Sequence, residues 1–259
     1  METVYSLVHL SDITCPPPKF IHAAAKAGYQ CVSLRTIPMG LKGEVPHDIA
    51  ADKQLFRDTE QALKDTGIFI NDTENARIYD GVDIAAYEPA LEAISRLGVH
   101  HILTNIWTPD SDYYTEKFCE LCELAEKYDM TVNVEFVTWA SVKDMKTVKE
   151  LLLRSGKKNV GVVVDLLHFH RSRCKLEEFD SMPREWFNYC LLYTSKQLCL
   201  LRGQQAVREE NRIAGNVVPA EIEQPGNVVQ TGDEMGIGPA VLDFLPYLRQ
   251  FLFSGFSGG

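Results

Sequence analysis

The sequence predicts an α/β fold in which parallel strands, each followed by a helix, close into a barrel. The chain has 259 residues, of which 45% are hydrophobic and 24% are charged. This is ordinary globular composition, and the length suits one large α/β domain. Short β-rich runs alternate with amphipathic stretches at intervals of roughly 25 to 37 residues. The repeated units contain no glycine-rich phosphate-binding turn, which favours a closed barrel over an open nucleotide-binding sheet.

Strands are expected where apolar and β-branched residues cluster. In chain order these runs cover residues 5–9, 31–35, 68–71, 101–105, 132–135 and 160–165. The run NVGVVVD is almost continuously apolar, which predicts a strand buried on both faces of the sheet. Two stripes at helical spacing predict helices between the strands: Ile84, Tyr87, Leu91 and Ile94 before Gly98, and Tyr114, Phe118, Leu121, Cys122 and Ala125.

Charge and cysteine content narrow the class of protein. The chain carries 26 Lys and Arg against 36 Asp and Glu, a net charge of −10, which disfavours nucleic acid as a partner. No apolar run reaches the roughly 18 residues of a membrane helix, and the first residues do not resemble a secretion signal, so we expect a cytoplasmic protein without membrane contact. The seven cysteines are an odd number without metal-type pairing, and free thiols are expected.

In a βα barrel the chemistry lies where strands end and loops begin, so polar residues at those points are candidates for the site. In chain order they are His9, Ser11 and Asp12, then Arg35, then Asn71, Asp72 and Glu74, then Asn105 and Trp107, then Glu135, and finally Asp165, His168 and His170.

Glu135 and Asp165 are the strongest pair among these candidates. Glu135 follows the run TVNV and Asp165 follows VGVVV, so two carboxylates one βα unit apart should project into the same mouth. Hard oxygen ligands suit Mg²⁺ or Mn²⁺, and an added imidazole extends the choice to Zn²⁺ or Co²⁺. A salt bridge or a helix N-cap is the alternative role for either carboxylate alone. The pair in register favours one divalent metal ion.

Several segments resemble the xylose-isomerase-like TIM barrel family of sugar phosphate isomerases and epimerases. VNVEFVTWASVKD and GVVVDLLHFHRSR resemble its fifth and sixth strand motifs, and CVSLRTIP, NDTENARI, YEPALEAISRLGVHHIL and MPREWFNY follow in family order. The resemblance covers roughly residues 1–190. It implies a (β/α)8 TIM barrel as a single domain over residues 1–259, with one metal held by residues of strands five to eight. Glu135 and Asp165 would be the first two ligands.

The same resemblance assigns roles to other candidates. His168, in an Asp-x-x-His motif, would bind a substrate oxygen near the metal, whereas His170 would point away; a loop cap is the alternative for either histidine. Arg35 could hold a carboxylate or phosphate through its guanidinium, or form a salt bridge across the barrel rim. Trp107 is expected to contact the substrate.

After Tyr189 the sequence departs from the family pattern, so we expect the barrel to be altered after residue 190. CLLYTSK intervenes before Gln197-Leu198-Cys199, which matches the family's seventh strand end but lacks the following Asp. Gln197 is the third ligand by motif. RIAGNVVPAEIEQ resembles the segment before strand eight, which leaves Glu234 or Asp233 as the last ligand, with Glu223 as the rival.

Two function classes follow. The first is a metal-dependent isomerase, epimerase or related dehydratase that removes a proton next to a metal-bound carbonyl of a small sugar, sugar phosphate or polyol derivative. Glu135 and Glu234 would be the bases, as the resemblance implies. The second is a degenerate, non-catalytic barrel that keeps a small-molecule pocket. Inositol derivatives, ketohexoses, hydroxypyruvate and dehydroshikimate all suit such a mouth, and the resemblance allows a homo-oligomer.

Overall fold

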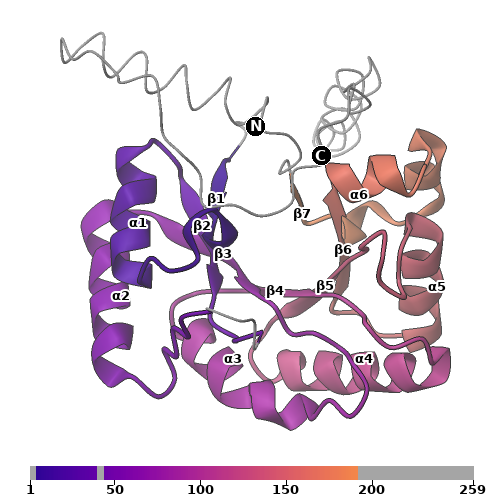
Figure 1. Cartoon of the computed structure of the whole chain (residues 1–259), viewed down its shortest axis with the longest axis horizontal. Helices are drawn as coiled ribbons and strands as arrows, with labels where there is room; N and C mark the ends of the chain where they lie inside the picture. Colours follow the sequence, from indigo (N-terminus) through magenta and orange to yellow (C-terminus); the bar gives the residue numbers. More distant parts are fainter. Residues whose placement is uncertain (1–3, 40–43, 192–259) are drawn as a thin grey trace, which may run out of the picture. The chain divides into compact units, whose positions relative to one another are not determined.

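A computed structural model describes residues 4–39 and 44–191 of the chain. In this part of the chain, parallel strands form one curved sheet with the helices on its outer side (Figure 1). Each strand pairs with the next one in the sequence, in the order β1 to β7. The strands are β1 Ser6–Val8, β2 Cys31–Arg35, β3 Phe69–Glu74, β4 His101–Thr104, β5 Thr131–Glu135, β6 Val160–Asp165 and β7 Tyr189–Leu191.

The helices follow the strands as the alternating pattern predicts. The α-helices are α1 Pro17–Lys26, α2 Lys53–Thr66, α3 Glu88–Ser95, α4 Ser111–Glu126, α5 Met145–Ser155 and α6 Leu166–Arg171. Short 3-10 turns cover His9–Asp12, Ile84–Tyr87, Leu176–Ser181 and Arg184–Trp186. Among the described residues, no helix is both long and apolar enough to cross a membrane.

Aspartate side chains cap the first turn of four of these helices, α2, α4, α5 and α6. Asp52 accepts hydrogen bonds from the second and third backbone N–H groups of α2, Asp110 does the same for α4, and Asp144 forms a capping box with Thr147 on α5. Such caps satisfy N–H groups that have no partner inside the helix. The same local chemistry therefore turns the chain from a loop into a helix in several βα units of the fold.

The core lies between the sheet and these helices. Every residue of β2 and β6 is buried, as expected for strands covered on both faces. Side chains of neighbouring segments approach the β6 backbone closely at Gly161, where a Cβ would lie 2.2 Å from Oδ1 of Asn133 and 2.5 Å from Nδ2 of Asn188. Glycine is therefore required for the close approach of β5, β6 and the segment before β7.

The predicted strands are confirmed with shifts at their ends. β1 ends at Val8, and the predicted last residue His9 starts a 3-10 turn. β3 runs to Glu74 rather than to Asn71, because Ser33 and Arg35 of β2 hydrogen-bond to Asp72 and Glu74 and extend the pairing. The described cysteines are free thiols, as predicted, and Cys199 lies outside the described residues.

The seventh strand lies earlier in the chain than the motif at 197–199 predicts. β7 starts at Tyr189, directly after the REWFN segment, and pairs in parallel with β6. Aromatic and apolar side chains at 189–191 suit a strand packed against β6. Within the described residues β1 and β7 are the two edges of the sheet. The predicted eighth strand, at 227–235 or 216–225, lies outside the described residues.

Candidate metal site

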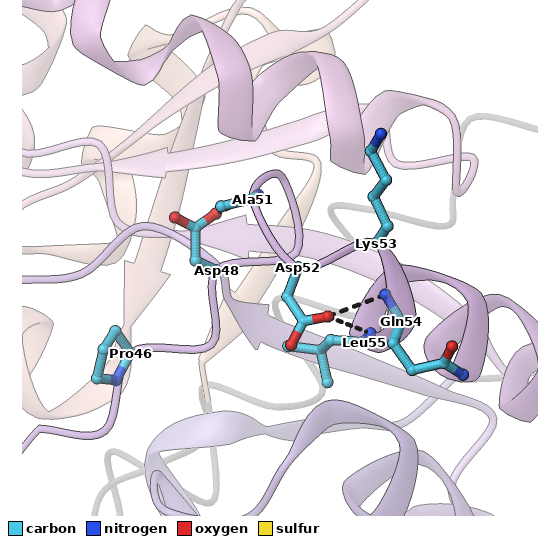
Figure 2. A pocket seen from close by; sticks show the side chains of 7 residues that line it. All are labelled: Pro46, Asp48, Ala51, Asp52, Lys53, Gln54 and Leu55. Atoms are coloured by element: carbon cyan, nitrogen blue, oxygen red, sulfur yellow. Dashed lines mark hydrogen bonds between the residues drawn. The ribbon is translucent and has the colours of Figure 1, made fainter.

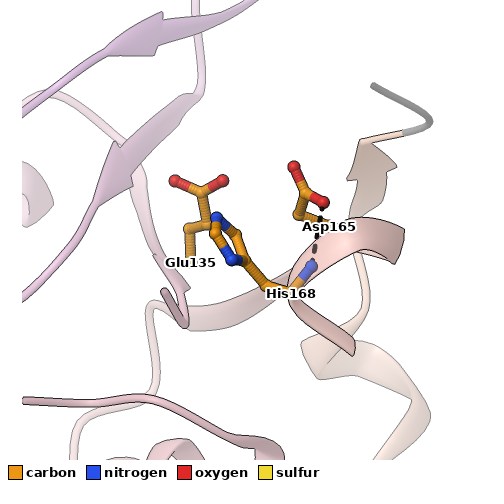
Figure 3. Close-up of side chains that lie close together, drawn as sticks. All are labelled: Glu135, Asp165 and His168. Carbon is orange, nitrogen blue, oxygen red and sulfur yellow. Dashed lines mark hydrogen bonds between the residues drawn. The ribbon is translucent and has the colours of Figure 1, made fainter. Parts of the chain in front are cut away.

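Glu135, Asp165 and His168 lie together at the carboxyl ends of β5 and β6. Each offers one ligand atom, and these atoms lie within 4.8 Å of one another. Figure 3 shows the His168 imidazole beside the Glu135 carboxylate, with Asp165 on the neighbouring strand. Glu135 ends β5, Asp165 ends β6, and His168 lies in the first turn of α6. The predicted approach of the two carboxylates is therefore confirmed.

The two oxygens of the Asp165 carboxylate differ in their hydrogen bonds. Oδ1 accepts hydrogen bonds from the backbone N–H groups of Leu167 at 2.6 Å and His168 at 3.3 Å, so it caps α6. The described residues make no hydrogen bond to Oδ2. The N-cap that the sequence offered as an alternative to a metal ligand is thus present, and it occupies only one of the two oxygens.

Both carboxyl groups hold their protons more tightly than usual. Burial and the nearby Asp165 carboxylate raise the pKa of Glu135 to about 8, although this side chain keeps some exposed surface. Burial raises the pKa of Asp165 to about 6, against the lowering effect of its two backbone hydrogen bonds. No described Lys or Arg forms an ion pair with either group. Two close, buried carboxylates without a cationic partner fit a divalent cation, since hard oxygen ligands are what such ions take.

The hydrogen bonds of His168 define which ring nitrogen carries its proton. Nδ1 accepts from the backbone N–H of Thr138 at 3.3 Å and lies 3.1 Å from the Thr138 hydroxyl. Burial lowers the pKa of His168 to about 4, so the ring is neutral and its proton lies on Nε2. A protonated Nε2 donates a hydrogen bond and does not ligate a metal. This geometry supports the predicted substrate contact of His168.

Glu135 is itself held by Asn105, the residue that directly follows β4. Nδ2 of Asn105 donates to Oε2 of Glu135 at 3.3 Å, and Oδ1 of Asn105 accepts from the Trp107 indole at 2.6 Å. Trp107 remains 37% exposed, so its ring faces solvent while its N–H points into the site. The sequence placed Asn105 and Trp107 at a strand end, and no signal in it indicated that they contact Glu135.

Arg35 pairs with Glu74. One guanidinium nitrogen lies 2.7 Å from Oε2 of Glu74, and both side chains are buried. Of the two roles that the sequence left open for Arg35, the structure contains the salt bridge. The N–H on Nε of Arg35 is a buried donor without a hydrogen-bond partner among the described residues.

Two histidines near strand ends lie outside the site. His9 is fully buried and accepts from the Arg35 backbone N–H at 3.1 Å through Nδ1, while Nε2 lies 2.8 Å from the Cys15 carbonyl oxygen. Both ring nitrogens are thus occupied, and burial lowers the pKa of His9. His170 is exposed on α6, in agreement with the expectation that it points away.

The remaining predicted ligands cannot be placed: Gln197, Glu223, Asp233 and Glu234 lie outside the described residues. A separate surface hollow at the start of α2 contains none of the predicted site residues (Figure 2). Its two carboxylates are already bonded to backbone N–H groups, Asp48 to those of Ala50 and Ala51 and Asp52 to those of Gln54 and Leu55. The carboxyl ends of β5 and β6 are therefore the candidate site.

The fold and the site together define a class of protein, a parallel βα barrel that binds its ligand at the carboxyl ends of the strands. A protein family model described as "Xylose isomerase-like TIM barrel" matches residues 21–190. The chain belongs to this family, and the resemblance seen in the sequence is confirmed. No curated protein matches the chain.

Solved structures show the same fold at low sequence identity. The IolI protein with a bound zinc atom has a TM-score of 0.61 at 16% identity, covering 73% of this chain and 72% of its own. The 3-keto-D-glucoside 4-epimerase of E. coli has a TM-score of 0.60 at 13% identity, covering 96% and 100%. The probable 3-DHS dehydratase AsbF of Bacillus anthracis has 0.58 at 17%, covering 73% and 72%. Such identities establish the fold alone.

Proposed function

We propose that this protein is a divalent-metal-dependent isomerase or epimerase, or a related dehydratase, acting on a small sugar or polyol-derived carbonyl compound. One observation carries the proposal: two largely buried carboxylates at the ends of adjacent strands lie close together, and neither forms an ion pair with a described Lys or Arg. The zinc atom in the IolI structure, and the sugar epimerase and dehydratase among the similar structures, support this choice of chemistry.

Glu135 and Asp165 would hold the metal, and Gln197 with Glu234 or its rivals Asp233 and Glu223 would complete the set. Bound there, a divalent ion would polarise a substrate carbonyl and favour loss of the adjacent carbon-bound proton. Glu135 is proposed as the base that takes this proton, as the family resemblance implies, because its carboxylate lies beside the position that a metal-bound carbonyl would occupy. Glu234 is proposed as the second base on the opposite face.

Other residues of the chain would orient the substrate. His168 presents an N–H on Nε2 beside the two carboxylates, which suits a hydrogen bond to a substrate hydroxyl or carbonyl oxygen. The exposed face of Trp107 suits contact with the apolar face of a sugar ring. Arg35 offers its unpaired Nε to a substrate oxygen, while Glu74 neutralises its charge.

Metal content and proton exchange test the proposal. Mn²⁺, Zn²⁺, Co²⁺ and Mg²⁺ are titrated into metal-free protein, and each loaded form is incubated in D₂O with ketohexoses, inosose, hydroxypyruvate and dehydroshikimate. We expect one metal equivalent and deuterium incorporation next to the carbonyl, or dehydration, for one substrate. Glu135→Gln should abolish exchange, whereas Glu116→Gln, at an exposed position on α4, should retain it.

Two results would contradict the proposal. A protein that binds none of these ions in its folded form refutes the enzyme proposal and indicates the non-catalytic barrel. Metal binding without exchange on any of these compounds refutes the proposed substrate class.

A further inference from the structure

We propose that Asn105 and Trp107 form a positioning pair that fixes the Glu135 carboxylate, with one oxygen tied and the other presented to the metal. The inference rests on the proposed function, in which Glu135 is a ligand and base. Asn105 and Trp107 are positioning residues in this scheme because they act through Glu135. Three features support the inference. Backbone hydrogen bonds hold the segment that carries the pair, the indole fixes the orientation of the Asn105 amide, and only one of the two Glu135 oxygens accepts a hydrogen bond.

The backbone around the pair is clamped to the segment that follows β3. The N–H of Ile78 donates to the Asn105 carbonyl at 3.0 Å, and the N–H of Trp107 donates to the Ile78 carbonyl at 2.7 Å. Ile106, between the pair, and Ile78 are both fully buried and form a parallel bridge. The carbonyl of Ile106 also accepts from the N–H of Ser141 on the loop after β5. The backbone of residues 105–107 is therefore held by hydrogen bonds to Ile78 on one side and to Ser141 on the other.

The indole fixes the orientation of the Asn105 amide. An indole N–H can only donate, so the atom that it contacts at 2.6 Å must be the amide oxygen. The amide nitrogen is then turned toward Glu135, where it can only donate. Asn105 is 4% exposed, so water does not compete freely for either end of the amide. Without the indole, the amide could turn over and place its oxygen against a carboxylate.

The contact with Asn105 makes the two oxygens of Glu135 differ in their hydrogen bonds. Oε2 accepts from Asn105, and the described residues make no hydrogen bond to Oε1. A carboxylate with one oxygen tied loses rotational freedom, and its second oxygen is left for a cation or a proton. Partners that orient a metal ligand in this way typically contribute about 10- to 100-fold in metal affinity.

Four single variants separate positioning from stability. Asn105→Leu removes the donor and keeps the number and branching of the side-chain heavy atoms, and Trp107→Phe keeps an aromatic ring but removes the indole N–H that orients the amide. Trp186→Phe is the control for the second change, because Trp186 lies in the 3-10 turn before β7 and makes no hydrogen bond to the carboxylate pair among the described residues. Asn159→Leu is the control for the first, because this amide donates to the carbonyls of Cys122 and Met130 and makes no contact with the carboxylate pair.

The experiment measures Mn²⁺ affinity by calorimetry and unfolding by urea for the parent protein and all four variants. We expect Asn105→Leu to weaken Mn²⁺ binding about 10- to 100-fold and Trp107→Phe about 3- to 10-fold. Trp186→Phe and Asn159→Leu should stay within about twofold, although Asn159→Leu lowers stability. Crystal structures of metal-free parent and Asn105→Leu protein give a second readout, the position of the Glu135 carboxylate, which should differ.

The results that overturn the inference are distinct from those that overturn the proposed function. Unchanged Mn²⁺ affinity in Asn105→Leu, or an equal loss in Asn159→Leu, shows that Asn105 serves stability alone. A parent protein that binds no Mn²⁺ refutes the proposed function, and the inference is then decided by the crystal structures. A Glu135 carboxylate in the same place in both structures refutes it, and a displaced carboxylate supports it.

Discussion

The most specific stability prediction concerns Asp72, a buried residue of β3. The hydroxyl of Ser33 lies 2.7 Å from Oδ2 of Asp72 and 2.9 Å from Oε1 of Glu74. One hydroxyl has one hydrogen and can donate to only one of these carboxylates at a time. Arg35 already pairs with the other oxygen of Glu74. The arrangement is fully satisfied if Asp72 is protonated, donates to Ser33, and Ser33 donates to Glu74.

The pKa of Asp72 agrees with this assignment. Burial and the neighbouring Glu74 raise it from 3.8 to about 7. Between these values the folded state binds a proton that the unfolded state has lost, so stability falls as the pH rises from 4 to 7. Each unit of raised pKa corresponds to about 1.4 kcal/mol, so an ionised Asp72 destabilises the fold by about 4 kcal/mol at pH 8 as an upper figure.

Asp72→Asn imitates the protonated state. The new amide can accept from Asn71, as Oδ1 of Asp72 does at 2.8 Å, and can donate to Ser33. We therefore expect the variant to be more stable than the parent at pH 8, by about 1 to 4 kcal/mol. The gain should fall to less than half at pH 5, because the parent is then mostly protonated at this site.

Urea unfolding of both proteins in the metal-free state at pH 8 and pH 5 measures the effect. Asp80→Asn, at an exposed position, serves as the control and should change stability by less than about 0.5 kcal/mol at either pH. An Asp72→Asn variant that is less stable at pH 8, or whose gain does not depend on pH, would refute the protonated assignment.

Three further predictions concern the site and the sheet. Glu135→Gln and Asp165→Asn should each weaken Mn²⁺ binding more than about 100-fold, because each removes a proposed ligand. Each should also raise the melting temperature of the metal-free protein by a few degrees in calorimetry, because each removes one carboxylate from a close pair. His168→Ala should keep Mn²⁺ affinity within about threefold while proton exchange falls at least tenfold, since its Nε2 carries a proton; a parallel loss of metal would make it a ligand. Gly161→Ala should destabilise the protein by about 1 to 3 kcal/mol in urea, since the new methyl group would displace Asn133; unchanged stability would contradict the close contact.

Sequence periodicity was sufficient to predict the first six strands and the close approach of the two carboxylates. Continuous apolar runs make buried parallel strands, and the residue that ends such a run must lie at the mouth of the barrel. Glu135 and Asp165 both occupy that position, on strands that pair directly. Their proximity followed from strand order alone and needed no knowledge of side-chain conformation.

Contacts between side chains of different strands were beyond this reasoning. Whether Arg35 meets a ligand or Glu74 depends on the register of β2 against β3, which includes a bulge between Val32 and Ser33. Strand β3 was predicted to end at Asn71, so the pairing of Arg35 with Glu74 on the same sheet was not foreseen. The link from Trp107 through Asn105 to Glu135 likewise depends on the path of a loop, and loop paths are not encoded in a periodic pattern.

The described sheet contains two pairs of buried acids, and the difference between them separates structure from function. Asp72 and Glu74 are compensated within the chain, since Arg35 neutralises Glu74 and the Ser33 hydroxyl joins the two carboxyl groups. Glu135 and Asp165 receive hydrogen bonds but form no ion pair with a described cation. Leaving such a pair uncompensated destabilises the fold, and a bound divalent cation would remove this unfavourable energy. The uncompensated pair is therefore the one that we assign to a metal.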